Sequence, residues 1–431
     1  MKKVVSIILM LVLLIPAFAV RTSAVENEVT VTLNGFKIVF DVPGRIIGDR
    51  TMVPLRMIFQ VLGADVEWIG ETREIISTYG DDTIKLAIGS KELYKNGEMI
   101  YTLDVPPIIV EENGESRTLV PVRAISESLG FVVKWDPDTA TAMIYDFRDT
   151  EVEDSTFARR LIGSMPIDYD TYTYFRSYAS KELGAGSSEF LENEENKTLL
   201  EETADEYLKY YYSVLHLAAS LGMSKYDPEV INTVNSAFEE YKSFYGPAFD
   251  EVLAENGMTE KLFKDLLYAS LFEKEIFDGY SVIASEMTAE QKTKELLQDP
   301  SLIRVSHILV DSREVAESLL EEAKSASDDE FYEMTQEYGK DNGMDDNKDG
   351  YYFTPDHMLP EFEAAAYSLE IGETSDIVKS KYGYHIIRRL PLDMDYISRN
   401  TDGLYVLKAE SDYYSMIDQL SDILVIHKFD E

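Results

Sequence analysis

The sequence predicts an α+β protein built from several domains. Three observations support this: a strand, helix and strand pattern that occurs twice in the first third of the chain, amphipathic helical stripes in the middle, and two β-branched segments that enclose helical periodicity near the end. With 431 residues the chain can bury several hydrophobic cores. We therefore expect a duplicated β-hairpin and helix domain, an α-helical domain, and a further α+β domain.

The composition is that of a soluble protein with a large excess of acidic residues. Apolar residues make up 45% of the chain and charged residues 28%, with 80 acidic against 40 basic side chains and a net charge of -40. Phosphate backbones are bound by basic surfaces, so this charge argues against a nucleic-acid partner. Cysteine is absent, which excludes disulfides, thiolate metal sites, a cysteine nucleophile and a lipid-modified N-terminal cysteine.

The N-terminus has the features of a secretory signal peptide over residues 1–24. Met1-Lys2-Lys3 gives a basic start, Val4 to Val20 is apolar, and small residues follow. No second apolar run is long enough to span a bilayer. We expect a mature protein outside the cytoplasm, either secreted or associated with the cell surface. The alternative is an uncleaved membrane anchor, because the apolar run approaches spanning length.

Residues 25–149 contain hairpin signals and an internal repeat. Asn34-Gly35 and Asn96-Gly97 each separate two segments of alternating hydrophobicity, which is the pattern of a two-residue hairpin turn. The segment Arg50–Trp68 recurs 67 residues later as Arg117–Trp135, with ten of nineteen positions identical. This part of the chain is therefore a duplication.

Each copy predicts a strand, a helix that begins at a proline and ends at a glycine, and a second strand that ends in tryptophan. Trp68 and Trp135 are the only tryptophans of the chain, and we expect both in the core. The pattern resembles the N-terminal domain of copper amine oxidases, a module also found by itself on secreted bacterial proteins as a stalk or surface-attachment unit. Oxidase chemistry in that family needs three copper-binding histidines, but the first histidine here is His216, outside the domain. A spacer role, cell-wall association and partner binding all stay open.

Residues 150–300 carry apolar residues at helical spacing. One stripe runs through Leu191–Met223, Asp227-Pro228 begins a second helix with an N-cap and a proline at the first position, and Gly257-Met-Thr259 precedes a third. The tyrosines of Tyr169–Tyr178 either line a surface for unfolded clients or pack in the helical core. Aromatic stripes at helical spacing favour the core.

Residues 301–390 hold two strand-like segments that each have a central histidine. Ile303–Val310 contains His307, Tyr382–Arg388 contains His385, and Gly-Glu-Thr-Ser-Asp ending at Asp376 lies between them. These motifs, in this order and spacing, resemble the parvulin family of peptidyl-prolyl isomerases. The resemblance implies an FKBP-like α+β domain.

The helices before this segment also resemble part of a known family. Residues 150–300 followed by a parvulin-like segment are similar to the chaperone portion of extracytoplasmic foldases of the PrsA and SurA kind. In such proteins the trailing segment, here residues 391–431, completes the helical domain, and the parvulin is an insertion. The resemblance implies that unfolded or proline-containing secreted polypeptides are the partners. Oligomeric state is not determined by the sequence.

Rotation about an X-Pro peptide bond faces a barrier of roughly 18–20 kcal/mol and takes tens to hundreds of seconds without a catalyst. No bond is broken and no group is transferred. An apolar pocket beside a small polar cluster can lower the barrier by desolvating the proline and by binding the twisted amide better than either planar form. Such a site requires no metal and no cofactor.

The parvulin resemblance implies a set of site residues. The catalytic cluster consists of His307, Asp341, His385 and Ser380, and the apolar residues that contact the proline ring are Met358 and Phe362. The family usually has a leucine in a Gly-Gly-Asp-Leu-Gly motif as one pocket wall, and Gly350 or Tyr351 stands there in this chain. Either the wall is missing, or Tyr351 or Tyr352 replaces it.

The same loop satisfies the first half of a calcium-binding pattern. The candidate ligands are Asp345, Asn347, Asp349 and Asp356. No helix pair clearly flanks the loop, and Asp, Asn and Gly clusters are ordinary turn formers. Calcium binding and a simple turn are both compatible with this sequence.

The sequence as a whole predicts a secreted peptidyl-prolyl cis/trans isomerase with a helical chaperone domain and an N-terminal stalk. The first alternative is a non-catalytic extracytoplasmic chaperone that retains the parvulin fold. The second is a surface-binding protein whose main activity lies in the N-terminal repeat.

Overall fold

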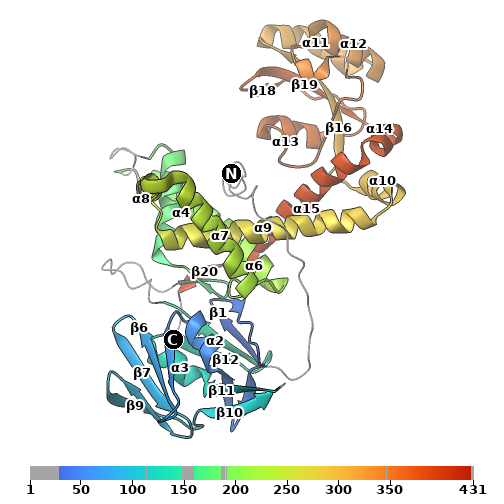
Figure 1. Cartoon of the computed structure of the whole chain (residues 1–431). Coiled ribbons are helices and arrows are strands. Elements are labelled where there is room, and N and C mark those ends of the chain that lie inside the picture. Colours follow the sequence, from blue (N-terminus) through green and yellow to red (C-terminus); the bar gives the residue numbers. More distant parts are fainter. Residues whose placement is uncertain are drawn as a thin grey trace. The chain divides into compact units, whose positions relative to one another are not determined.

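The structure is a computed structural model of the chain, and it divides into two compact units (Figure 1). It describes residues 29–112, 114–147, 160–185, 190, 192–345 and 347–428. The inserted unit comprises residues 275–416, and the discontinuous unit comprises the described residues up to 274 together with residues 417–428. The predicted signal peptide at residues 1–24 lies outside the described residues.

Within its described residues, the N-terminal part of the discontinuous unit contains three sheets and two short helices. One sheet has the order β12-β13-β1-β2, formed by Val132–Asp136, Thr141–Tyr145, Thr30–Leu33 and Phe36–Lys37. A second has the order β10-β11-β4-β3, formed by Ile108–Glu112, Glu115–Pro121, Arg50–Pro54 and Arg45–Ile47. The third is an antiparallel meander of β5 to β9, Asp65–Ile69, Glu74–Tyr79, Asp82–Ala87, Glu92–Lys95 and Glu98–Thr102. The helices are α2, Leu55–Val61, and α3, Val122–Ser128.

Local chemistry explains the predicted hairpins, which the structure confirms. Asn34 and Gly35 both have positive φ, as do Asn96 and Gly97, and this backbone conformation matches the twist of the strands that each turn connects. β1 pairs antiparallel with β2, and β8 with β9.

The duplication produces a local two-fold axis in the second sheet. β4 and β11 are antiparallel, and Val53 pairs with Val120, its own equivalent in the repeat. On either side of it, Leu119 pairs with Pro54 and Pro121 pairs with Met52. These two pairs are also equivalent, because Leu119 corresponds to Met52 and Pro121 to Pro54 in the repeat. The two copies therefore contribute equivalent strands to one sheet, and both helices help to bury a shared core.

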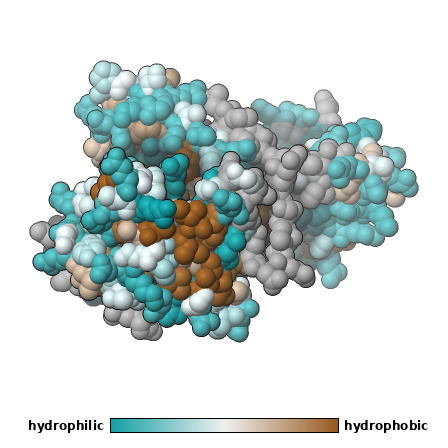
Figure 2. Space-filling view, turned by 60° about the horizontal axis from the view of Figure 1, so that its bottom comes forward, coloured by the Kyte–Doolittle hydropathy of each residue, from teal (hydrophilic) through white to brown (hydrophobic). Residues whose placement is uncertain are grey.

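The prediction that the tryptophans are core residues is wrong. The exposed fraction is 45% for Trp68 and 36% for Trp135. Trp68 lies on β5 and Trp135 on β12, and each of these is the edge strand of its sheet. The core between the copies is filled instead by residues such as Phe59 and Ile125, both fully buried. The space-filling view in Figure 2 shows an apolar area on one face of the molecule.

Helices form most of the rest of the discontinuous unit. They are α4, α6, α7, α8 and α9, at Tyr169–Glu182, Glu194–Ser220, Pro228–Tyr245, Phe249–Glu255 and Glu260–Glu286, with a 3-10 turn at Gly246–Ala248. Asp227 caps α7 and Pro228 stands in its first turn, which confirms that predicted start. The tyrosine-rich helix α4 packs on α6, where the Tyr178 and Tyr207 rings meet edge to face at 5.3 Å.

A small sheet closes this helical part with the end of the chain. Its strands are β15, β14 and β20, at Met165–Pro166, Arg160–Ile162 and Ile426–Lys428. Arg160 pairs with Lys428, so the chain returns to the helical part after forming the inserted unit.

The inserted unit has a four-stranded antiparallel sheet with helices on both faces. The sheet order is β17-β16-β19-β18, at Tyr351–Phe353, Ile303–Val310, Gly383–Leu390 and Val378–Ser380. Its helices are α10, α11, α12, α13, α14 and α15, at Ala289–Gln298, Arg313–Ser325, Asp328–Tyr338, Pro360–Ser368, Met394–Arg399 and Thr401–Ile423, with a 3-10 turn at Asn342–Met344. Ile308 and Val310 of β16 pack with α11 and α12, whereas Ile303 and Val305 pack with α13.

The division into units differs from the boundaries expected at residues 300 and 390. It falls at 274 and 416, inside the long helices α9 and α15. Leu296, Ile397 and Leu404 form one buried cluster with Tyr352 of the central sheet, so α10, α14 and most of α15 belong to the inserted unit. In the described part of the chain, no helix combines the length and the apolar character needed to cross a membrane.

The packing predicts a large effect of truncating Phe331, which is fully buried between α11, α12 and the sheet. We expect Phe331→Ala to lower the free energy of unfolding of the inserted unit by about 3 to 5 kcal/mol, because it removes apolar burial and leaves a cavity. Urea titration followed by far-ultraviolet circular dichroism measures this. Phe244→Ala is the control, since Phe244 is 81% exposed and its loss should change stability by less than about 0.5 kcal/mol.

Candidate active site

Strand alternation places the two central histidines on one face of the sheet. β16 and β19 are antiparallel, with His307 opposite Ile387 and Leu309 opposite His385. The histidines are thus diagonal neighbours, and side chains in that relation are close enough to interact. Both are almost fully buried, at 3% and 4% exposure. They share their face of the sheet with Val305 and α13.

The predicted catalytic residues form one continuous hydrogen-bonded chain. His307 Nδ1 lies 3.0 Å from His385 Nδ1, and the two rings are stacked 13° from parallel. His307 Nε2 lies 2.7 Å from Asp341 Oδ2, and Ser380 Oγ lies 2.7 Å from His385 Nε2. The structure therefore brings together His307, Asp341, His385 and Ser380.

The order of partners fixes the direction of the hydrogen bonds when both imidazoles are neutral. Asp341 as a carboxylate can only accept, so His307 donates from Nε2 and its Nδ1 is left as an acceptor. His385 then donates from Nδ1, and its Nε2 accepts from the Ser380 hydroxyl. Ser380 Oγ in turn accepts from the Tyr382 backbone amide at 3.1 Å. Each of these contacts contains one proton, so the buried ring nitrogens of both histidines and the Ser380 hydroxyl all have hydrogen-bond partners.

The surroundings shift the pKa values of this cluster in opposite directions. Burial, with a smaller contribution from His307, lowers the pKa of His385 to about 4, so His385 is neutral at pH 7. The hydrogen bond from His307 holds the pKa of Asp341 well below its usual range, although burial opposes this. Asp341 is therefore an anion that orients His307.

Asp341 is held in place by two further donors. It caps the 3-10 turn by accepting from the Gly343 amide at 2.9 Å, and it accepts from the Tyr351 hydroxyl at 3.0 Å. A Cβ atom on Gly343 would overlap the Tyr351 hydroxyl, so glycine is needed for this approach. Burial and the charge of Asp341 raise the pKa of Tyr351 to about 12, which keeps it a donor. Sequence reasoning missed Gly343, and no local pattern marks it.

Aromatic and apolar groups flank the histidine pair. The Phe362 ring meets His307 edge to face at 5.1 Å and His385 at 5.3 Å. Met358 is partly buried in the same cluster. The Tyr351 ring lies 5.7 Å from that of His307. Met358, Phe362 and Tyr351 thus belong to the surroundings of the histidine pair, and their contact with a proline ring stays a prediction.

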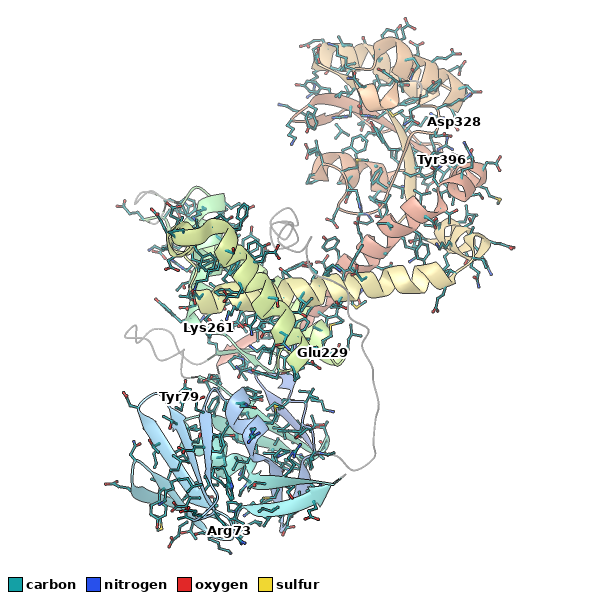
Figure 3. The ribbon with its side chains drawn as sticks, viewed as in Figure 1. Arg73, Tyr79, Glu229, Lys261, Asp328 and Tyr396 are labelled. Carbon is teal, nitrogen blue, oxygen red and sulfur yellow. The ribbon has the colours of Figure 1, made fainter. Side chains whose placement is uncertain are left out.

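Tyr352 does not lie at this site, which corrects its inclusion among the substrate-binding candidates. Successive side chains of a strand point to opposite faces of the sheet, so the Tyr352 side chain lies on the face opposite to that of Tyr351. The Tyr352 ring stacks on Tyr396, labelled in Figure 3, with centroids 4.3 Å apart, and its hydroxyl accepts from the Asp393 amide. Gly350 cannot supply a wall either, because its φ is positive and a Cβ would overlap the Val305 carbonyl oxygen. Of these three neighbouring candidates, Tyr351 is the one whose ring lies beside His307.

The candidate calcium ligands are not gathered into a metal site. Within the described residues, no group of three or more His, Asp or Glu side chains could hold a metal ion. Asn347 uses its side chain to close its own loop, accepting from the Gly350 amide and donating to the carbonyls of Gly343 and Gly350. Asp345 and Asp349 lie in this same loop, which the Asn347 side chain closes.

Two parts of the chain match known families. Residues 307–390 match the model of the PPIC-type PPIase domain, and residues 32–144 match that of the copper amine oxidase N-terminal domain. These matches confirm both resemblances, to parvulins and to the amine oxidase module. The class that the fold and the site define is a protein with a parvulin-type isomerase domain.

Curated relatives named as foldases match part of the chain. The chain is 37% identical over 157 residues to foldase protein PrsA 2 of Listeria monocytogenes, covering 36% of this chain and 52% of that protein. It is 34% identical to foldase protein PrsA of Geobacillus sp., covering 36% and 54%. The chain thus spans about half the length of the curated relatives it matches. Among solved structures, the peptidylprolyl isomerase PrsA from Bacillus anthracis is 26% identical, with 44% and 85% of the two chains covered and a TM-score of 0.25.

The geometry predicts that Gly343→Ala disturbs the site without removing any of its functional groups. The added methyl must displace the Tyr351 hydroxyl from Asp341, because the two atoms would overlap. We expect loss of the Tyr351 to Asp341 hydrogen bond and a rise in the pKa of Asp341, measured by NMR titration of its carboxyl carbon. Asn342→Ala, in the same turn, is the control. An unchanged Asp341 titration in Gly343→Ala would contradict this arrangement.

A second prediction concerns acid stability. Since the pKa of His385 is lowered to about 4 and that of an unfolded histidine is about 6.5, the unfolded chain binds more protons between these pH values. Stability should therefore fall as the pH decreases from 6.5 to 4. We expect His385→Gln to reduce this loss, measured by urea unfolding at pH 7.0 and pH 4.5. His427→Gln, which changes an exposed histidine outside the inserted unit, is the control.

Proposed function

We propose that this protein is an extracytoplasmic peptidyl-prolyl cis/trans isomerase that assists the folding of exported proteins. The observation that carries the proposal is the buried His307 and His385 pair with Phe362 against both rings. The PPIC-type match and the PrsA relatives support it. The signal-like residues 1–24 and the foldase relatives support a location outside the cytoplasm.

The site has the two components that the reaction needs. Phe362, Met358 and the Tyr351 ring offer an apolar surface for the pyrrolidine ring, and removing water from the amide favours the less polar, twisted form. The polar chain from Ser380 to Asp341 lies beside this surface and keeps a fixed hydrogen-bond pattern because it is buried and satisfied. The residues bind and orient the substrate, and no proton has to leave the protein.

Tyr351 has two roles in the proposed site. Its ring stands in place of the usual leucine wall, and its hydroxyl holds Asp341. A phenol ring is larger and flatter than leucine, so the pocket should still desolvate a proline while adding one polar edge. We infer that Tyr351 is a substrate-binding residue, and that the change from leucine preserves activity rather than ending it.

The rest of the chain fits a role in holding unfolded clients. Phe244 and Tyr245 at the end of α7 form an edge-to-face pair, and their side chains are 81% and 41% exposed. Exposed adjacent aromatic rings are typical of surfaces that bind other proteins. We infer that the helical part captures proline-containing polypeptides. We also infer that residues 29–147, which include the match to the copper amine oxidase N-terminal domain, act as a stalk.

A second candidate function is a chaperone that has lost catalysis. The observation that favours it is the altered loop, in which Gly350-Tyr351 replaces the family motif. Such a chaperone binds prolyl segments through the parvulin fold without accelerating their isomerisation. The two candidates share the same binding site and differ only in whether the twisted amide is bound better than the planar forms.

Exchange NMR on a short Ala-Pro peptide, with and without the full chain, tests the activity. We expect accelerated cis/trans exchange, and a roughly tenfold or larger loss in His385→Ala and in Met358→Ala, because each removes one component of the site. Tyr352→Phe is the matched control, since Tyr352 lies on the opposite face of the sheet. No acceleration with several residues before proline, but retained peptide binding, would show the non-catalytic chaperone instead.

A further inference from the structure

The duplicated domain has two equivalent surface grooves that the proposed isomerase does not use. Groove A, of about 440 Å³, is lined by Ile46, Arg50, Thr51, Arg123 and Trp135, among others. Groove B, of about 470 Å³, is lined by Ile109, Arg117, Thr118, Arg56 and Trp68, among others. The local two-fold axis through the Val53 and Val120 pair relates these two sets. Each groove therefore takes its tryptophan from one copy and its isoleucine from the other.

The equivalence extends beyond the nineteen-residue repeat. In groove A, Arg50 forms an ion pair with Asp104 at 2.5 Å, and in groove B, Arg117 forms one with Asp41 at 2.6 Å. Asp41 lies four residues before β3, and Asp104 lies four residues before β10. β3 and β10 are the two edge strands of the symmetric sheet. The same arginine–aspartate pair thus borders both grooves, although both aspartates lie outside the nineteen-residue repeat.

Maintaining the fold does not account for the side chains that the two copies share. Identical buried residues such as Val53 and Val120 are explained by packing. Trp68 and Trp135 are identical although both are exposed, and so are Arg56 and Arg123. Other exposed positions have diverged, for example Gln60, whose equivalent is Glu127. An exposed indole kept twice at the same place in a groove indicates a ligand surface.

The grooves also differ in charge from the rest of the molecule. The chain has twice as many acidic as basic residues, whereas the lining of groove B has two basic side chains against one acidic, and that of groove A three against two. Arg56 is exposed, and no hydrogen bond or ion pair joins it to another described residue, so its guanidinium is available to an anionic group. The equivalent Arg123 lies 3.9 Å from Glu127 in an exposed pair, and such pairs contribute little and can exchange for a ligand anion. A second copy of the chain, with its net charge of -40, would be repelled as an occupant.

We propose that grooves A and B bind an acidic polysaccharide, one segment of the polymer in each groove. The axial C–H groups of a sugar ring carry partial positive charge and pack on the electron-rich face of an indole. A carboxylate or phosphate on the polymer pairs with Arg56 or Arg123. Two equivalent grooves favour a polymer of repeating units. Once one segment of the polymer is bound in the first groove, binding of another segment in the second groove is intramolecular, which increases the overall affinity. This inference is independent of the isomerase.

Tryptophan fluorescence of the full chain provides a direct test, since the chain has only two tryptophans and each lies in one groove. The probe is polygalacturonate, titrated as a long polymer and as a tetramer at pH 7 and low salt. We expect both to change the emission and the long polymer to bind at least tenfold more tightly. Either Arg56→Ala or Arg123→Ala should remove this tenfold advantage, and the double variant should abolish binding. Lys91→Ala, an exposed lysine outside both linings, is the control.

Three results would overturn the proposal. The first is unchanged emission at millimolar tetramer together with undetectable binding of the long polymer. The second is an equal affinity for neutral dextran, which would remove the role of the arginines. The third is an equal, arginine-dependent response to polyglutamate, which would show that the grooves bind acidic polypeptides instead. Peptide isomerisation, measured in the same variants, should stay at the unsubstituted level, because both grooves lie outside the inserted unit.

Discussion

The buried contact between His307 and His385 is the constraint on which the inserted unit depends. Two imidazoles that face each other across β16 and β19 leave water together, so each ring nitrogen needs a partner inside the protein. Ser380 satisfies one end of the pair and Asp341 the other. Asp341 then requires its own donors, which explains why a glycine and a tyrosine come together beside it.

The inserted unit can be rigid because its sheet is covered on both faces. Helices α11 and α12 bury one side, and α13 buries the side that carries the histidines. α13 therefore contributes both to the core and to the candidate site, because its residue Phe362 belongs to the core cluster and also contacts both imidazoles. A site built from strand residues and one packed helix holds its groups more precisely than a site on loops, which suits a reaction that depends on shape and desolvation.

Duplication has a different consequence in the N-terminal part. The copies meet through equivalent strands, and each of the two grooves is lined by residues of both copies. Packing explains the shared core, but the exposed tryptophans at the edge strands belong to the two grooves. The helical part that follows is closed by the last described strand, β20, which pairs with β14. Segments more than 250 residues apart in sequence therefore form one small sheet.

The sequence by itself determined the features that arise from local chemistry. Asn-Gly turns, the Asp227-Pro228 helix start, the repeat and the strand motifs around His307 and His385 follow from backbone preferences and periodicity. The tertiary structure decided which faces are covered. Alternation separates Tyr351 from Tyr352, but only the packing of α13 and Tyr396 shows which one faces the site. Trp68 and Trp135 are exposed because their strands lie at sheet edges, and Gly343 matters because a distant hydroxyl approaches it. Such contacts join residues far apart in the chain, and no local pattern encodes them.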